Sequence, residues 1–270
     1  MSAQPKVVNQ LKDKKVVVLG GSSGLGFGAA SGIIEEGGSV VIASSSEERV
    51  SKAVERLSDP AQQYNADKSR ISGHVLNLKG SDVESRLKDF FSQVGQFDHL
   101  IYTSGDSLAV KGLEEHTYES IVEAANVRLI SALLAVKVAV YGGYLREGGS
   151  IVLTTGSVVE GPLEKWSVVA GFASSIYGLA RSLAFDLSPR NIRVNAISPG
   201  PVDTELFDSF GPEAKAATFK HLEGLALTHR VGRITDLAQA YLYVLKDTNI
   251  TGQTIGSNGG TLFGPGPASQ

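Results

Sequence analysis

The chain contains no cysteine among its 270 residues, and it has only one methionine and one tryptophan. Without cysteine the protein forms no disulfide bond and offers no thiolate to a metal, a composition that fits a reducing compartment. The five histidines also lack the spacing of a metal site; they stand at positions 74, 99, 116, 221 and 229. We therefore expect no bound metal.

Charge of one sign and long hydrophobic runs are scarce as well. The formal net charge is -3, and the lysines and arginines are scattered, which argues against a nucleic acid partner. No apolar run approaches the roughly 20 residues that span a bilayer, and residues 1–15 lack the apolar core of a signal peptide. These features predict a cytoplasmic protein without a membrane partner.

Apolar, β-branched segments recur along the chain and alternate with stretches of helical periodicity. This alternation predicts an α/β fold, with a single doubly wound (Rossmann-type) parallel sheet and helices on both faces. Residues 205–230 interrupt the rhythm beyond a strand's carboxyl end, where substrate lids occur. We expect one domain over residues 1–270, with strands at 15–20, 39–44, 73–78, 98–104, 150–156, 192–198 and 252–258.

A glycine-rich stretch, "VVVLGGSSGLGFGAA", joins the first expected strand to the helix after it. It places Gly20, Gly24 and Gly26 at the join. Glycine permits a tight turn and a close approach of the backbone, and a helix N-terminus offers amide donors to a pyrophosphate. The stretch therefore predicts a dinucleotide-binding loop, although a glycine-rich turn without a ligand has the same composition.

With four further motifs in the same order, the chain resembles the short-chain dehydrogenase/reductase family over nearly its whole length. The motifs are "YTSG" (102–105), "AANVRL" (124–129), "TTGSVVEG" (154–161) and "RVNAISPGPVDTEL" (193–206). The resemblance implies a Rossmann fold and a bound NAD(P)(H). It places the cofactor at Gly20, Ser22, Ser23, Gly24, Leu25, Gly26, Ser44, Ser45, Ser46, Arg49, Asn77, Leu78, Ser104, Gly105, Pro199, Gly200, Val202 and Thr204.

The choice between the two dinucleotides depends on the end of the second strand, where an acidic side chain binds the ribose of NAD and repels the phosphate of NADP. The sequence there is "ASSSEER", in which three serines precede two glutamates and Arg49. The serines can donate to phosphate oxygens and Arg49 can reach back to them. NADP(H) is favoured, although Glu47 and Glu48 lie close by.

The resemblance also exposes a departure in the helix expected at 165–187. The family uses a tyrosine to protonate the substrate and a lysine one turn later, and these positions fall on Val169 and Ala173. Tyr177 and Arg181 keep the same spacing but lie eight residues later, a shift of roughly 12 Å along a helix that also changes the face. We therefore interpret Tyr177 and Arg181 as packing and surface residues.

Four side chains remain as candidate catalytic residues: Arg128, Ser157, Glu164 and Trp166. Ser157 keeps the family's substrate-binding position, or simply ends a strand. Arg128 stands in a largely apolar helix, where a buried guanidinium needs a partner anion, or it forms a surface salt bridge. Trp166 forms an apolar wall beside Val169, or is a core residue.

Asn126, Glu160 and Tyr102 have open roles as well. Asn126 matches a helix asparagine of the family, with either a structural or a catalytic role. Glu160 and Glu164 are the nearest carboxylates, and solvated loop charges are the alternative for each. Tyr102 or Glu164 could serve as the proton donor of an ordinary carbonyl reductase.

Within the family, the chain is similar to divergent fungal members that lack the tyrosine and lysine, such as those of malbrancheamide and paraherquamide biosynthesis. The shared features are the arginine of "NVRL", the tryptophan of "WSVVAGF" and the ending "YLYVLKDTNITGQ". The resemblance implies reduction of an imine-type intermediate and control of a Diels–Alder cyclisation. That set carries an aspartate three residues before the tryptophan; this chain has Leu163, so Glu164 or Glu160 would have to substitute.

We therefore predict an NADPH-dependent reductase of an iminium or similarly activated substrate in alkaloid-type secondary metabolism. A carbonyl reductase with another proton donor is one alternative. A non-redox cyclase, isomerase or NADP(H)-sensing protein is the other. The apolar helices expected at about 114–146 and 165–187 also predict a homodimer or homotetramer, because their exposed faces need cover.

Overall fold

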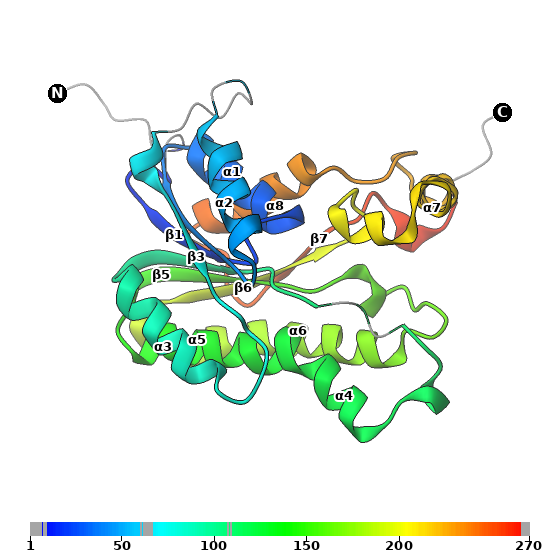
Figure 1. Cartoon of the computed structure of the whole chain (residues 1–270), viewed down its shortest axis with the longest axis horizontal. Helices are drawn as coiled ribbons and strands as arrows, with labels where there is room; N and C mark the ends of the chain where they lie inside the picture. The colour runs from blue at the N-terminus through cyan, green and yellow to red at the C-terminus, as the bar shows by residue number, and fades with distance from the viewer. Residues whose placement is uncertain are drawn as a thin grey trace.

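The fold is the expected one, a seven-stranded parallel sheet between two layers of helices (Figure 1). The structure is a computed structural model that describes residues 7, 10–59, 61, 67–106, 108 and 110–265. All seven expected strands are confirmed to within a few residues, except that the fifth begins earlier. Their bounds are β1 (Lys15–Leu19), β2 (Ser39–Ser44), β3 (Ile71–Val75), β4 (Phe97–Tyr102), β5 (Leu145–Thr154), β6 (Arg193–Pro199) and β7 (Thr254–Ser257).

The order of the strands across the sheet is β3-β2-β1-β4-β5-β6-β7, and every neighbouring pair is parallel. The chain runs outward to β3, then crosses back to place β4 beside β1. This reversal makes the edge beyond the carboxyl ends of β1 and β4 the crevice in which open α/β sheets bind ligands. The glycine loop follows β1 and the "YTSG" motif ends β4, so both motifs reach that crevice.

Helices cover both faces of the sheet and explain why its central strands, such as β1 and β2, are buried on both sides. Helices α1, α2 and α8 lie on one face, and α3, α5 and α6 pack on the other (Figure 1). The bounds are α1 (Gly24–Glu35), α2 (Glu47–Ser58), α3 (Val83–Val94), α4 (Tyr118–Ala125), α5 (Ala132–Tyr141), α6 (Ser167–Asp186), α7 (Pro212–Leu225) and α8 (Ile234–Lys246).

The helix expected at 114–146 is not one α-helix, and this prediction was wrong in its form and its ends. It consists of α4, a π-helical segment over Asn126–Ser131 and α5. The apolar periodicity continues through all three, which hides the wider π turn. Gly142 and Gly143, the latter at φ +76°, end the helix because glycine adopts this backbone conformation freely. Strand β5 therefore begins at Leu145.

The expected lid forms a short 3-10 stretch, Glu205–Phe210, followed by α7. No residue of α7 is buried. The lid is held by Lys215, whose Nζ lies 2.9 Å from Asp203 Oδ1 and 2.8 Å from Asp208 Oδ1, and by Phe207 and Phe219, whose ring centroids are 5.1 Å apart.

Candidate active site

Glycine is required where the loop after β1 meets the loop after β4. Gly20 has φ +92°, and a Cβ there would lie 2.7 Å from the backbone nitrogen of Ser104. A Cβ on Gly26 would lie 2.3 Å from the carbonyl oxygen of Gly20. Any larger residue would push these loops apart. The glycine loop is therefore a tight turn in contact with the "YTSG" motif at the sheet's carboxyl edge.

The first amide of α1 already holds an anion. Gly24 N–H donates to Glu205 Oε2 at 2.8 Å, and the helix has no acidic residue of its own in the first turn. Ser23, the N-cap, makes no side-chain capping bond. The donor and its distance from a carboxylate oxygen suit an anionic group at this helix N-terminus, so the loop fits a dinucleotide pyrophosphate.

The end of β2 presents the expected serines and arginine together. Arg49 Nη2 donates to Ser45 Oγ at 2.9 Å, while Ser46 Oγ caps α2 by accepting from Arg49 N–H. Glu48 is paired along the helix with Lys52, 2.6 Å away. The arginine therefore reaches back to the strand end, and one of the two glutamates has its own cation.

The other expected cofactor residues surround the same edge. Leu78 and Val202 are buried, and Thr204 lies against Gly24, with its Cγ2 3.5 Å from the position of a Cβ there. Gly200 N–H donates to the carbonyl of Ser257, which fixes the loop after β6 against β7. Asn77 lies after β3, and the oxygen of its amide, Oδ1, accepts from Lys79 N–H at 3.0 Å.

Arg128 has the partner anion that its apolar surroundings predict. Its Nη2 donates to the carbonyl oxygen of Asp106 at 2.5 Å, and its Nε lies 3.6 Å from Asp106 Oδ1. The guanidinium lies against Gly105, where a Cβ would be 2.7 Å from its central carbon. Burial lowers the pKa of Arg128 and the Asp106 carboxylate opposes that shift, so the group stays cationic.

The π-helical segment helps to place Arg128. π turns widen a helix locally and are frequent at functional sites. Here the carbonyl of Val127 accepts from the hydroxyl of Tyr102 at 2.5 Å, which ties the segment to β4. Tyr102 is 3% exposed, and burial raises the pKa of its phenol. Its proton is both inaccessible and engaged, so the structure contradicts Tyr102 as a proton donor.

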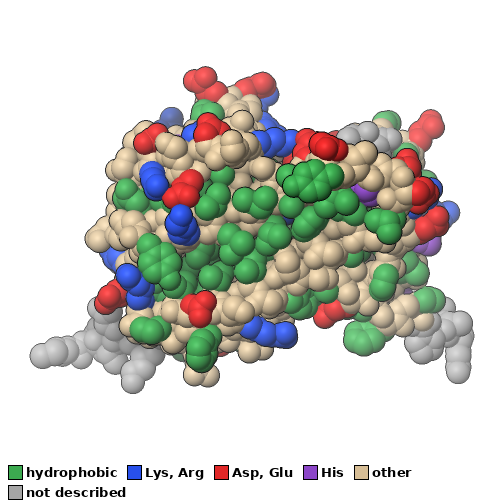
Figure 2. Space-filling view, turned by 90° about the horizontal axis from the view of Figure 1, so that it is seen from below, with side chains coloured by type: hydrophobic (Ala, Val, Ile, Leu, Met, Phe, Trp, Pro, Cys, Tyr) green, Lys and Arg blue, Asp and Glu red, His purple; other side chains and the backbone are tan. Residues whose placement is uncertain are grey.

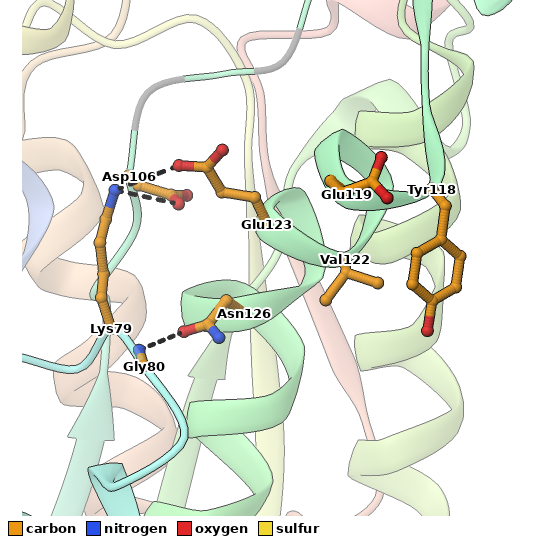
Figure 3. Close-up of a pocket in the computed structure, with 8 residues that line it drawn as sticks. All are labelled: Lys79, Gly80, Asp106, Tyr118, Glu119, Val122, Glu123 and Asn126. Carbon is orange, nitrogen blue, oxygen red and sulfur yellow. Dashed lines mark hydrogen bonds and ion pairs between the residues drawn. The ribbon is translucent and has the colours of Figure 1, made fainter.

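Asn126 and Asp106 line a cavity of about 380 Å³ beside α4 (Figure 3). Asn126 Oδ1 accepts from Gly80 N–H at 3.3 Å, and Lys79 Nζ lies 3.9 Å from both Asp106 Oδ2 and Glu123 Oε1. Asn126 therefore joins the end of α4 to the loop after β3. This contact is structural, which is one of the two roles expected for Asn126.

The first turns of α6 present no acid or base at the two positions where the family resemblance expects them. Val169 is 8% exposed and Ala173 is partly buried. Thr155 Oγ1 donates to the carbonyl of Ala173 at 2.7 Å, so the end of β5 is bonded to this turn of the helix. The position expected for a lysine thus carries only the methyl group of Ala173, and the carbonyl of the same residue accepts a hydrogen bond from Thr155.

The other proposed catalytic residues lie on the connection from β5 to α6. Ser157 is partly buried in the 3-10 turn Ser157–Val159, which packs against α6. Trp166 is the N-cap of α6, partly buried, and its carbonyl accepts the helix's first bond, from Ala170 N–H at 2.7 Å. Glu164 is exposed, as a solvated loop charge would be.

Tyr177, interpreted from the sequence as a packing residue, is held against β6 through its hydroxyl. Tyr177 is partly buried and adjoins the helix face that buries Val169, Ile176 and Ala180. Its hydroxyl donates to Ser198 Oγ at 3.0 Å. Burial raises the pKa of Tyr177, the bond to Ser198 opposes the shift, and Glu160 adds to it. Arg181 is exposed, as expected.

Comparison with known proteins agrees with this geometry. Residues 7–263 match the family described as an SDR-like Rossmann domain. The chain is a short-chain dehydrogenase/reductase. Short-chain dehydrogenase/reductase fsr5 of Gibberella fujikuroi is 37% identical over 97% of this chain and 100% of its own length. The enzyme malC of Malbranchea aurantiaca is 30% identical over 94% and 96%.

Solved structures of this reductase family show the same fold. The structure of MalC Reductase/Diels–Alderase from Malbranchea aurantiaca has a TM-score of 0.86 at 29% identity, covering 94% of this chain and 98% of its own. A small-chain dehydrogenase in complex with NADPH has a TM-score of 0.72 at 28% identity, covering 94% and 100%. The expected family and the resemblance to its divergent fungal members are confirmed.

Three residues of this region were not identified from the sequence: Asp106, Glu205 and Ser198. Each acts through a partner far along the chain, namely Arg128, Gly24 and Tyr177. Asp106 alone had a usable signal, since it is an acid directly after Gly105 at a strand's carboxyl end. Nothing in the sequence near Glu205 indicates a contact with the glycine loop.

Proposed function

We propose that this reductase transfers hydride from NADPH to an iminium or similarly activated carbon. The observation that carries the proposal is the pair Val169 and Ala173, two apolar side chains at the positions where the family resemblance expects the acid and its lysine. A substrate that needs no acid suits such a site best.

The chemistry separates the substrate classes. Hydride addition to a ketone leaves an alkoxide, which needs a proton, and general acid catalysis is worth about 10²- to 10⁴-fold. Hydride addition to an iminium carbon sends the C=N electron pair to nitrogen, whose positive charge is lost, and no proton is needed. Loss of the donor therefore penalises ketones far more than iminium ions. The bound cofactor would supply the hydride.

The protein's part in this reaction is position and charge. Arg128, fixed by Asp106 against Gly105, holds a cation beside the loop after β4. Ser157 and Trp166, on the connection that leads into α6, would contact the substrate. Their partly buried positions are consistent with walls of a site between this connection and the lid.

A carbonyl reductase with another donor is less well supported. The hydroxyls of Tyr102 and Tyr177 both donate within the protein, to Val127 and Ser198. Their pKa values are raised, which makes each a weaker acid. Glu164 remains for this alternative, and it is exposed.

The proposal for NADP(H) over NAD(H) depends on β2. The bond from Arg49 to Ser45 gathers a cation and a hydroxyl where the 2'-phosphate would lie, and Glu48 is paired with Lys52. The similarity to a dehydrogenase in complex with NADPH supports this choice.

A cyclisation at the same site is the second candidate function, because the similar MalC is a reductase/Diels–Alderase. Leu163, 55% exposed, occupies the place of the aspartate in that set, so this chain would need Glu164 or Glu160 for its role. A non-redox cyclase, isomerase or NADP(H) sensor would use the same cofactor site without turnover.

We propose further that this single-domain enzyme acts in the cytoplasm. The pathway that we propose for it is alkaloid-type secondary metabolism.

The test is NADPH oxidation with a matched panel of a ketone, an aldehyde and a cyclic iminium ion of similar size. We expect oxidation with the iminium ion alone. Oxidation with the ketone at a comparable rate would favour the carbonyl reductase, and binding of NADPH without oxidation across a broad iminium panel would favour the non-redox class. Repeating the panel with NADH tests the cofactor preference.

A further inference from the structure

The contact between Glu205 and Gly24 joins two segments that lie 181 residues apart. Gly24 opens α1 immediately after the glycine loop, and Glu205 opens the lid. The helix supplies neither an acidic first turn nor a side-chain cap. The carboxylate therefore satisfies a backbone donor that the local sequence leaves free.

The same donor is the one that a dinucleotide pyrophosphate would use at this helix N-terminus. Glu205 Oε2 lies 2.8 Å from Gly24 N, which leaves no room for a phosphate oxygen at hydrogen-bond distance along the same N–H direction. A carboxylate and a phosphate would also repel each other at such a separation. The two anions are therefore alternatives at this amide.

Release of Glu205 would also reach α7. Asp203 and Asp208 flank Glu205 in sequence, and both pair with Lys215 in the first turns of α7. No residue of α7 belongs to either hydrophobic core of the sheet, so the helix lies outside the packing that fixes the Rossmann fold. Movement at Glu205 is thus coupled to the lid by ion pairs.

We propose that Glu205 is an internal competitor for the cofactor's phosphates, a latch that holds the lid against the glycine loop until a dinucleotide displaces it. The inference rests on the proposed cofactor site. It assigns Glu205 a role in setting cofactor affinity and lid release, separate from the residues that contact the substrate.

The first experiment compares the Kd of NADPH and of NADH for the native chain, Glu205→Gln and Glu213→Gln. Glu213 is an exposed acid of α7, so its variant changes the charge of the lid equally without touching Gly24. We expect Glu205→Gln to bind both dinucleotides about five- to tenfold more tightly, since the charge-assisted bond is lost and both ligands carry a pyrophosphate. Glu213→Gln should match the native chain.

The second experiment measures hydrogen exchange of residues 205–225 without cofactor. Faster exchange in Glu205→Gln than in Glu213→Gln supports the latch; equal exchange in the two variants overturns it. An unchanged or weaker affinity of Glu205→Gln for both dinucleotides also overturns it. If the native chain binds neither dinucleotide, the proposed cofactor function fails, while the exchange measurement still decides whether the latch exists.

Discussion

A single guanidinium, that of Arg49, reaches back over the end of β2 to Ser45. A charge-assisted bond to a 2'-phosphate is worth about 1.5–3 kcal/mol, and NADH has no such phosphate. Arg49→Ala should therefore weaken NADPH binding by about tenfold or more and leave NADH binding nearly unchanged. Fluorescence titration of both dinucleotides measures the difference.

Arg56→Ala is the matched control for Arg49→Ala, because Arg56 is an arginine of the same helix whose guanidinium lies over the Phe27 ring, 3.9 Å from its centroid. It should keep the native preference. Equal affinities of the native chain for NADPH and NADH would refute the assignment of the phosphate site to this strand end.

Restoring a tyrosine at Val169 and a lysine at Ala173 tests whether the site is adapted or decayed. The lysine would place a positive charge where a cationic substrate must approach, and two like charges about 4 Å apart repel by roughly 4 kcal/mol at an effective dielectric of 20. The tyrosine would fill space at a position that is 8% exposed. We expect the double variant to reduce the native substrate no faster, and more slowly if the charge dominates.

Single-turnover NADPH oxidation measures this effect once an active substrate is found. Ala173→Met is the control for the lysine, since it adds similar length without charge, and it should lose less activity than Ala173→Lys. Arg128→Ala and Trp166→Ala should each slow turnover. A gain of activity in the double variant would show that the missing pair reflects loss of function.

The sequence predicts only part of the site. Some site residues are recognisable from their immediate neighbours in the chain, whereas others depend on partners that are distant in sequence. Gly20 and Gly26 are recognisable since a turn with such close backbone contacts admits no side chain. The need of Arg128 for an anion is also predictable from its apolar helix. Its partner, and the pairing of Tyr177 with Ser198, depend on how α6 and the π-helical segment are rotated against the sheet, which no local pattern records.

At the scale of elements, the strands are predictable and the helix ends are less so. A strand buried on both faces is a continuous apolar run, as in β1 and β2, and its limits are marked by charge or glycine. The segment from α4 to α5 keeps an apolar periodicity through a π turn, so its pattern predicts a single helix. The same continuity carried the predicted helix past Gly142 to residue 146.

Two central strands are joined by a buried polar pair that makes the sheet sensitive to acid. His99 in β4 is 7% exposed, and its Nδ1 lies 2.9 Å from Ser150 Oγ in β5. Burial lowers the pKa of His99 from 6.5 to about 4. The unfolded chain thus binds a proton that the folded chain excludes, so this contribution to stability is present above pH 6.5 and is lost as the pH falls toward 4.

Urea unfolding at several pH values between 7.5 and 4.5 tests this acid sensitivity. The free energy of unfolding should fall by up to about 3 kcal/mol over the window, because one pKa unit corresponds to about 1.36 kcal/mol. His99→Asn should be less stable at pH 7.5 but show a flatter pH dependence. An equally steep dependence in His99→Asn would assign the effect to other groups.

At the scale of the whole molecule, one face carries a cluster of exposed hydrophobic side chains. Hydrophobic side chains gather over the face formed by α4, α5 and α6 (Figure 2). They include Ile121, Val122, Leu133 and Phe185, which are 36%, 40%, 37% and 81% exposed. Helix α6 is long and apolar enough to cross a membrane by composition, with a mean hydropathy of 1.4, yet only 17% of that stretch is buried. From the sequence we expect no apolar run near the roughly 20 residues that span a bilayer, and Ser167–Asp186 corrects that expectation.

An interface between two copies of the chain would cover this face. The sheet packs on the opposite side of α6 and fixes the helix within the fold, so burial against a second copy would account for its apolar outer surface. We predict a homodimer through α4, α5 and α6, with a tetramer as its further association.

Phe185→Glu places a charge in the apolar face and should shift the native species toward monomer at micromolar concentration. Phe263→Glu, at a side chain that is also 81% exposed but lies near the C-terminus, should leave the dimer intact. Light scattering of the three proteins measures the masses directly, and a native chain that is monomeric at these concentrations would refute the interface.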